Sequence, residues 1–166
     1  MHNTFQCRAL TEADLAEVAR LARRVWQATY PGIISQAQID AMLAVRYTDA
    51  ALRTYLDADD RWLEIVEIDG KIAGFCACEL HDGECKLDKI YIDPAHQRRG
   101  LGSLMMGRAT DHARSLGYSN MILAVNKRNV SAIAAYRKQG FAVRQSVCVD
   151  IGNGFVMDDF IMQKQL

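Results

Sequence analysis

The chain has 166 residues, of which 50% are hydrophobic and 24% charged, and its formal net charge at neutral pH is zero. This composition is typical of a globular protein, and we expect residues 1–166 to form a single domain. Because 20 basic residues balance 20 acidic ones, no excess positive charge attracts nucleic acid, which we exclude as a partner.

No apolar run reaches the roughly 18 residues that a membrane span needs, so a membrane protein is also excluded. The five cysteines lie mostly in apolar, strand-like runs, and no signal peptide precedes them, which predicts a cytoplasmic protein with reduced thiols. Cys76 and Cys78 form a Cys-x-Cys pair, but no second Cys/His pair stands at metal-binding spacing. We interpret both as small buried hydrophobic residues, and we expect no metal site.

The first third of the chain predicts a short strand over residues 5–9 and then helices. Thr11 is a typical N-cap for a helix that residues 30–32 (Tyr-Pro-Gly) end. The stretch Ser35-Gln36-Ala37-Gln38 has the pattern of a capping box for a second helix. A third helix is expected over residues 48–57.

Trp26 and Tyr30 lie near the break between the first two helices. Large aromatic side chains pack in a core more often than they line a pocket, but both interpretations stand at this point. As a pocket wall, these two residues would contact a substrate.

Residues 61–68 and 71–80 predict a β-hairpin, because Asp-Gly at positions 69–70 supplies the positive φ angles of a tight type I′ turn. A second turn at residues 81–83 leads into a strand over residues 85–92. Strands joined by such short turns indicate an antiparallel meander, which disfavours a parallel dinucleotide-binding fold.

The strand over residues 85–92 runs into a loop with two glycines and two arginines, followed by a helix. The first turn of a helix has unpaired N–H groups and a partial positive charge, so it attracts anions. Gly100 and Gly102 allow a close approach to the backbone, and Arg98 and Arg99 offer donors to phosphate oxygens. On these residues alone, an ordinary turn fits as well as an anion site.

The remaining chain predicts a strand over residues 121–125 and a helix capped by Asn129. Two final strands over residues 141–151 and 155–163 are joined by Gly-Asn-Gly, another hairpin signal. The order of elements is therefore mixed α/β with one meandering sheet.

Three segments of this C-terminal half stand in a defined order: the strand at residues 87–92, the loop Gln97-Arg98-Arg99-Gly100-Leu101-Gly102, and Asn129-(x)₂-Ala132-Ile133-(x)₂-Tyr136-(x)₃-Gly140-Phe141. Together they resemble the GNAT superfamily of acyl-CoA-dependent N-acetyltransferases, whose loop motif is Q/R-x-x-G-x-G/A. The tail at residues 154–162 is also similar to bacterial spermidine/spermine acetyltransferases. The resemblance implies an α/β (α+β) fold with a mixed, mostly antiparallel sheet of about seven strands and helices on both faces.

The resemblance further implies that acetyl-CoA, as co-substrate, lies in a V-shaped opening between the strand over residues 85–92 and the strand near residues 120–125. Main-chain groups of Ile90, Tyr91 and Ile92 would pair with the pantetheine arm. Asn129 would also bond the pantetheine, a role compatible with capping a helix. The backbone N–H groups that would hold the pyrophosphate belong to Gln97, Arg98, Arg99, Gly100, Leu101, Gly102 and Ser103.

Tyr136 matches a family tyrosine close to the thioester sulfur. With an ordinary pKa near 10, its phenol is suited to protonating a departing thiolate. The alternative is a tyrosine that only packs on its helix.

Asp88 stands where many relatives carry an acidic residue, so the resemblance makes it the candidate base for the attacking amine. Glu84, Glu79 and His81 are weaker alternatives nearby in the sequence. The family often has Glu at the position of Lys86, and a solvated surface carboxylate is an equally good interpretation of Asp88.

The expected reaction is acetyl transfer to a primary amine by direct attack in a ternary complex. We expect a small-molecule acceptor such as a polyamine, which Asp150, Asp158 and Asp159 would attract unless they are merely solvated. Acetylation of a protein N-terminus or lysine is one alternative, and a non-catalytic module that senses acetyl-CoA is another. Relatives are often dimers, so the resemblance also allows a homodimer.

Overall fold

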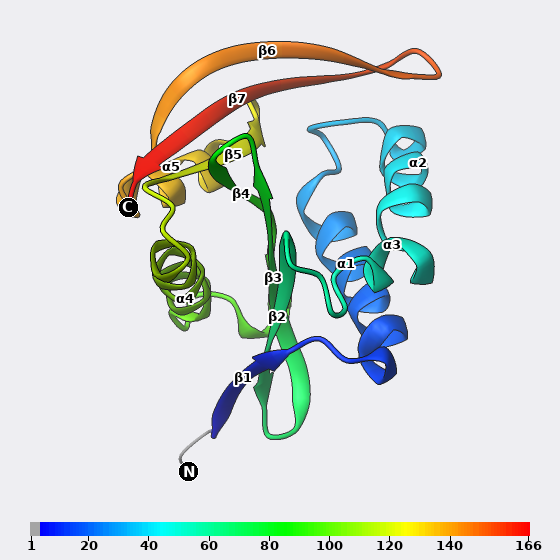
Figure 1. The fold of residues 1–166 in the computed structure, drawn as a ribbon. Coiled ribbons are helices and arrows are strands. Elements are labelled where there is room, and N and C mark those ends of the chain that lie inside the picture. Colours follow the sequence, from blue (N-terminus) through cyan, green and yellow to red (C-terminus); the bar gives the residue numbers. More distant parts are fainter. Residues whose placement is uncertain (1–3) are drawn as a thin grey trace.

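The computed structural model describes residues 4–166 and shows one central sheet with α1, α2 and α3 on one face and α4 and α5 on the other (Figure 1). The strands are β1 (Phe5–Ala9), β2 (Arg61–Ile68), β3 (Lys71–His81), β4 (Glu84–Ile92), β5 (Asn120–Asn126), β6 (Ala142–Gly152) and β7 (Phe155–Gln165). The helices are α1 (Leu15–Thr29), α2 (Gln36–Arg46), α3 (Asp49–Arg53), α4 (Leu101–Ser115) and α5 (Val130–Lys138). The predicted α/β fold is confirmed.

The seven strands have the order β1-β2-β3-β4-β5-β7-β6, and every neighbouring pair is antiparallel except β4 and β5. Asp69 and Gly70 both have positive φ angles, 50° and 76°, as the predicted type I′ turn between β2 and β3 requires. The predicted antiparallel meander is therefore confirmed for β2, β3 and β4.

Two helix predictions need correction. The third helix ends at Arg53 rather than at residue 57, since the next residues form tighter turns and Asp57 has a positive φ of 52°. At α2, Ser35 accepts from the backbone N–H of Gln38 as predicted. The Gln38 side chain does not complete the capping box, because its Nε2 donates to the Val156 carbonyl in β7 at 2.9 Å.

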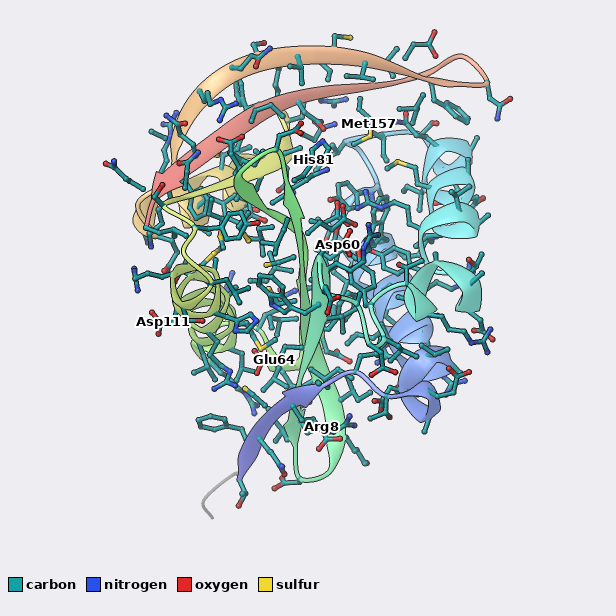
Figure 2. All side chains as sticks on the ribbon, viewed as in Figure 1. Arg8, Asp60, Glu64, His81, Asp111 and Met157 are labelled. Atoms are coloured by element: carbon teal, nitrogen blue, oxygen red, sulfur yellow. The ribbon has the colours of Figure 1, made fainter. Side chains whose placement is uncertain are left out.

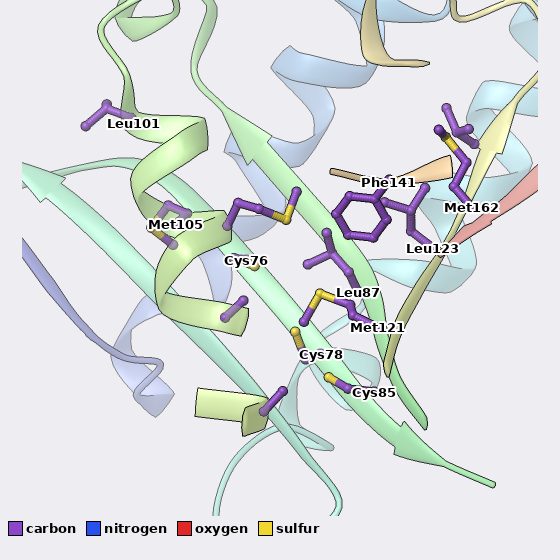
Figure 3. Close-up of a cluster of buried hydrophobic side chains, with 14 of the residues drawn as sticks. Cys76, Cys78, Cys85, Leu87, Leu101, Met105, Met121, Leu123, Phe141 and Met162 are labelled. Carbon is purple, nitrogen blue, oxygen red and sulfur yellow. The ribbon is translucent and has the colours of Figure 1, made fainter. Parts of the chain in front are cut away.

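The sheet separates two hydrophobic cores, because successive side chains of a strand point to opposite faces. In β3, Phe75 and Ala77 pack against α1, α2 and α3, whereas Cys76 and Cys78 pack against α4 and β5. Figure 3 shows these two cysteines among Leu87, Met105 and Met121. Cys76 is 2% exposed and Cys78 is fully buried, which confirms their interpretation as small core residues.

β4 and β5 separate soon after they meet. Their parallel pairing includes only Cys85 with Met121 and Lys86 with Ile122, although β4 continues to Ile92 and β5 to Asn126. The side of β4 that faces β5 is thus left without a strand partner over residues 87–92, and an opening forms between the two strands.

The hairpin of β6 and β7 extends beyond the end of β5. β7 pairs with β5 only from Asp159 onward, while its earlier residues pair with β6 alone. Figure 1 shows this hairpin arching over the sheet toward α2, where the Gln38 bond to Val156 holds it. The hairpin therefore covers the space between the first helices and the splayed strands. No helix within residues 4–166 is both long and apolar enough to cross a membrane.

Candidate active site

A cavity of about 770 Å³ lies where β4 and β5 separate, and α1, α2, α5 and β7 contribute to its walls. It brings together residues that are far apart in the chain, from Val25 in α1 to Asp159 in β7. Of the predicted site residues, all but Arg99 line it. They are Trp26, Tyr30, Asp88, Ile90, Tyr91, Ile92, Gln97, Arg98, Gly100, Leu101, Gly102, Ser103, Asn129 and Tyr136.

One end of the cavity is the loop before α4. Arg98 and Gly100 have positive φ angles of 61° and 79°, so the loop turns sharply before the helix begins at Leu101. Within residues 4–166, no backbone carbonyl accepts from the N–H groups of residues 97–103. Beyond the adjoining backbone, no atom of residues 4–166 lies within 4 Å of the position that a Cβ would take on Gly100 or Gly102. Unpaired donors, a helix N-terminus and open space together can hold a phosphate group.

Asn129 borders the same cavity from the start of α5. It is buried, and its Oδ1 accepts from the N–H of Ala132 at 3.4 Å as an N-cap. In the described part of the chain, its side-chain amide nitrogen donates to no other residue. The capping interaction therefore uses the oxygen and leaves the nitrogen for a ligand, so the two interpretations of Asn129 are compatible.

Tyr136 is half-buried on α5, and its ring lies edge-on to Phe141 with 6.0 Å between centroids. Burial, with a smaller contribution from Tyr30, raises the pKa of Tyr136 well above its ordinary value. The phenol is therefore protonated throughout the physiological pH range and can donate a proton at its hydroxyl oxygen.

Asp88 occupies a bulge in β4. Ala77 of β3 pairs with Lys89 and Cys78 pairs with Leu87, so Asp88 between them has no partner across the ladder. A bulge changes the face to which the following residues point. As a result Leu87 lies in the core beside α4, whereas Lys89 lies near Tyr47 and Tyr55 on the side of the first three helices.

The Asp88 carboxylate is surrounded by cations. Its side chain is 12% exposed and pairs with Arg46 at 3.3 Å, with Lys86 at 3.5 Å and with the buried Lys89. Burial alone would raise the pKa of Asp88, but Lys89 and Arg46 outweigh it and hold the pKa well below its usual range. Asp88 is therefore an ionised, paired carboxylate, which contradicts its interpretation as a solvated surface residue.

The three weaker candidates for the base do not line the cavity. Glu84 pairs with Arg144 at 2.6 Å, Glu79 accepts from the hydroxyl of Tyr55 at 3.3 Å, and His81 lies exposed beside Asp82. Among the predicted bases, only Asp88 lies in the cavity wall.

Trp26 and Tyr30 form an aromatic wall of the cavity. Their ring centroids are 4.4 Å apart, and the Trp26 Nε1 donates to the Tyr47 hydroxyl at 3.2 Å. Trp26 is 2% exposed, so it belongs to the core and to the wall at the same time.

Sequence reasoning missed Arg46 and Lys86 as charged residues of the cavity, and it did not separate Asp159 from its neighbours. Arg46, at the end of α2, pairs with Asp88 and lies over the Trp26 ring. Asp159 was grouped with Asp150 and Asp158 as a carboxylate that could be merely solvated, but it is only 4% exposed. Strand alternation was the available signal. It places Met157 and Asp159 on the inward face of the strand and Asp158 on the outward face.

The described residues hold no cluster of three or more His, Cys, Asp or Glu side chains that could bind a metal ion. The chemistry that the cavity offers comes from an anion site, a protonated phenol and carboxylates. These groups suit a ligand with phosphates at one end and a basic group at the other.

Comparison with known proteins gives consistent matches. The model of the acetyltransferase (GNAT) family matches residues 18–141. The spermidine N(1)-acetyltransferase of Thermoplasma acidophilum is 24% identical over 166 residues, which cover 98% of each chain. The streptothricin acetyltransferase of Streptomyces lavendulae is 39% identical over 88 residues, but these span only 52% of this chain and 47% of that protein.

Among solved structures, PaiA N-acetyltransferase from Thermoplasma acidophilum in complex with coenzyme A superimposes with a TM-score of 0.84. The two chains are 24% identical, and the match covers 98% of this chain and 99% of the other. The ribosomal-protein-S18-alanine N-acetyltransferase of Escherichia coli gives a TM-score of 0.74 at 20% identity. At these identities the structural matches show a shared fold.

Proposed function

The chain belongs to the GNAT family of acetyltransferases, and from this premise we propose that it transfers the acetyl group of acetyl-CoA to a primary amine of a small molecule. One observation carries the proposal. A single cavity joins the unpaired N–H groups of the loop at residues 97–103, the phenol of Tyr136 and a region with two carboxylates, Asp88 and Asp159.

The cofactor end fits coenzyme A in three ways. The N–H groups of residues 97–103 lack backbone acceptors, so they are available to the pyrophosphate. The edge of β4 at Ile90, Tyr91 and Ile92 has no strand partner on the β5 side, so its backbone groups can pair with the amides of the pantetheine arm as a strand would. Asn129 offers its side-chain nitrogen to the same arm.

The acceptor end fits an alkyl amine. Tyr30 and Met42 supply apolar surface, and Asp159 supplies a carboxylate that is in no ion pair within residues 4–166, whereas Asp88 is already paired with cations. An acceptor that carries an ammonium group on a methylene chain matches both features, and a polyamine is the simplest example.

Two proton transfers accompany the reaction, because the attacking nitrogen must lose a proton and the departing sulfur must gain one. An amine with a pKa of about 10.4 is neutral in only about 1 molecule in 2,500 at pH 7, which costs roughly 4.6 kcal/mol. We assign Tyr136 as the acid, since its hydroxyl is protonated at neutral pH and lies in the cavity wall, although its raised pKa makes it a weaker acid than a free phenol.

The part played by Asp88 follows from its partners. An efficient base has a pKa near the working pH, whereas Lys89 and Arg46 hold the pKa of Asp88 far lower. Asp88 is therefore better suited to positioning Arg46 and Lys89 than to removing the proton itself. If Asp88→Asn has the same pH–rate profile as the wild type, another group acts as the base.

An assay for CoA thiol release tests the proposal with a panel of polyamines, aminoglycosides, amino acids and peptides. Release with small amines is the expected result. Release only with peptides would indicate a protein acetyltransferase instead. Binding of acetyl-CoA without release across the panel would indicate a sensor.

A further inference from the structure

Two adjacent aspartates of β7 have opposite surroundings. Asp158 is exposed over 55% of its side chain, and its Oδ1 accepts from the Nζ of Lys127 at 2.5 Å. Asp159 is 4% exposed, and its buried Oδ1 has no hydrogen-bond partner within residues 4–166. Because a buried carboxylate oxygen without a donor is unfavourable, Asp159 requires an explanation other than stability.

Charged groups lie around Asp159, but none of them bonds it. Asp158 of its own strand acts on it through space, as do Arg46 of α2, Lys86 of β4 and Lys127 after β5. Tyr30, directly after α1, is also close enough for the two groups to influence each other. Burial, followed by repulsion from Asp158, raises the pKa of Asp159, and the cations reduce this effect only in part. The Asp159 carboxylate can therefore still accept a hydrogen bond from a positively charged donor.

Asp159 faces the cavity. Met157 and Asp159 share one face of β7, both line the cavity, and Figure 2 shows Met157 beneath β7 on the side toward α2. Gln38 and Met42 of α2 lie in the same wall. A ligand that reaches Asp159 thus passes apolar side chains suited to methylene groups.

From this geometry we propose that Asp159 binds an ammonium group of the acceptor, and so selects amines with a positive charge and an alkyl chain. This inference rests on the proposed function, since it names the group that recognises the acceptor. An ammonium group brings charge and three donors, and it would satisfy the unpaired Oδ1.

The test compares Asp159→Asn with the matched control Asp158→Asn, using spermidine as the acceptor. In Asp159→Asn we expect the KM for spermidine to rise about 10-fold or more, with the KM for acetyl-CoA unchanged. We expect Asp158→Asn to stay within about 2-fold of the wild type in both constants, because its carboxylate points away from the cavity. Asp159→Glu, which keeps the charge, should recover part of the affinity.

Two further measurements separate binding from structure. Asp159→Asn should melt no lower than the wild type, because it removes an unpaired buried charge. Equilibrium dialysis with radiolabelled spermidine should show weaker binding to Asp159→Asn even where turnover is not measured.

The outcomes distinguish this inference from the function on which it rests. If the wild type and Asp159→Asn have the same KM for spermidine and bind it equally well, the inference is wrong. CoA release by the wild type would in that case still support the proposed function. Binding that depends on Asp159 without CoA release from any amine would support the inference and overturn the function. A wild type that binds no spermidine would also overturn the inference.

Discussion

Replacing Asp88 by Asn tests whether its carboxylate organises the centre of the molecule. The change keeps the shape of the side chain but removes the negative charge that Lys89 and Arg46 share. Lys89 is almost fully buried, with the Tyr55 hydroxyl at 2.9 Å from its Nζ as its other polar partner. Without Asp88, the buried ammonium keeps the Tyr55 hydroxyl and the more distant charge of Glu79, but no directly paired anion among residues 4–166.

The size of the effect follows from this burial. Removing one partner of a buried ion pair typically costs 3–5 kcal/mol, and the remaining partners here suggest the lower end, about 3 kcal/mol. For a domain of this length, about 3 kcal/mol corresponds to a fall in Tm of roughly 6–12 °C.

The pH dependence has a definite sign. The folded-state pKa of Asp88 lies below the unfolded value of 3.8, so its contribution is complete above that value and is lost as pH falls through the folded pKa. The wild type should therefore have a higher free energy of unfolding than Asp88→Asn throughout the range from pH 5 to pH 8. In the variant, Lys89 should lose its proton more readily, so part of the deficit should disappear toward pH 10.

Urea denaturation at several pH values measures these free energies of unfolding. Lys86→Gln is the control, because Lys86 is 39% exposed and its pairing with Asp88 is worth at most about 1 kcal/mol. Lys89→Met added to Asp88→Asn should restore stability, since it removes the unpaired cation. A loss below about 1 kcal/mol in Asp88→Asn, or no recovery in the double variant, would refute this account.

Two other variants test separate parts of the site. Tyr136→Phe should lower kcat about 10-fold or more with an unchanged KM for acetyl-CoA, as measured by thiol release, and unchanged turnover would remove Tyr136 from the mechanism. Gly74→Ala should cost about 1–3 kcal/mol in urea denaturation, because a Cβ at Gly74 would lie 2.8 Å from the Tyr91 carbonyl oxygen. Its control, Gly107→Ala, should not destabilise the protein, since nothing lies within 4 Å of a Cβ on that helical residue.

Local sequence signals predicted most of the fold. Asp-Gly at residues 69–70 and Gly-Asn-Gly at residues 152–154 fix their turns through backbone conformation alone, and both hairpins are present. The same holds for Asn129, whose short polar side chain caps the next helix. The end of α3 was less predictable, because tight turns after Arg53 use residues that would also suit a helix.

The two halves of the cavity were not equally predictable. The loop at residues 97–103 is continuous in sequence, and its glycine and helix N-terminus act locally, so its residues could be named before the fold was known. Asp88, in contrast, lies in the cavity wall, but its low pKa depends on Lys89 and on Arg46, which lies 42 residues earlier. Such a contact depends on tertiary packing, which no local pattern contains.

The proposed acceptor end combines segments that only the fold brings together: α1, α2, β4 and the first part of β7. Within β7, residues 155–158 have no partner in β5, so the sheet does not fix this end of the hairpin on that side. The hydrogen bond from Gln38 to Val156 anchors it to α2 instead, three residues before Asp159. Asp159 itself pairs with Asn126 of β5, so the sheet holds its backbone, whereas α2 holds the adjoining end of the hairpin that carries Val156. Changes in α2 should therefore alter acceptor preference without disturbing the coenzyme end.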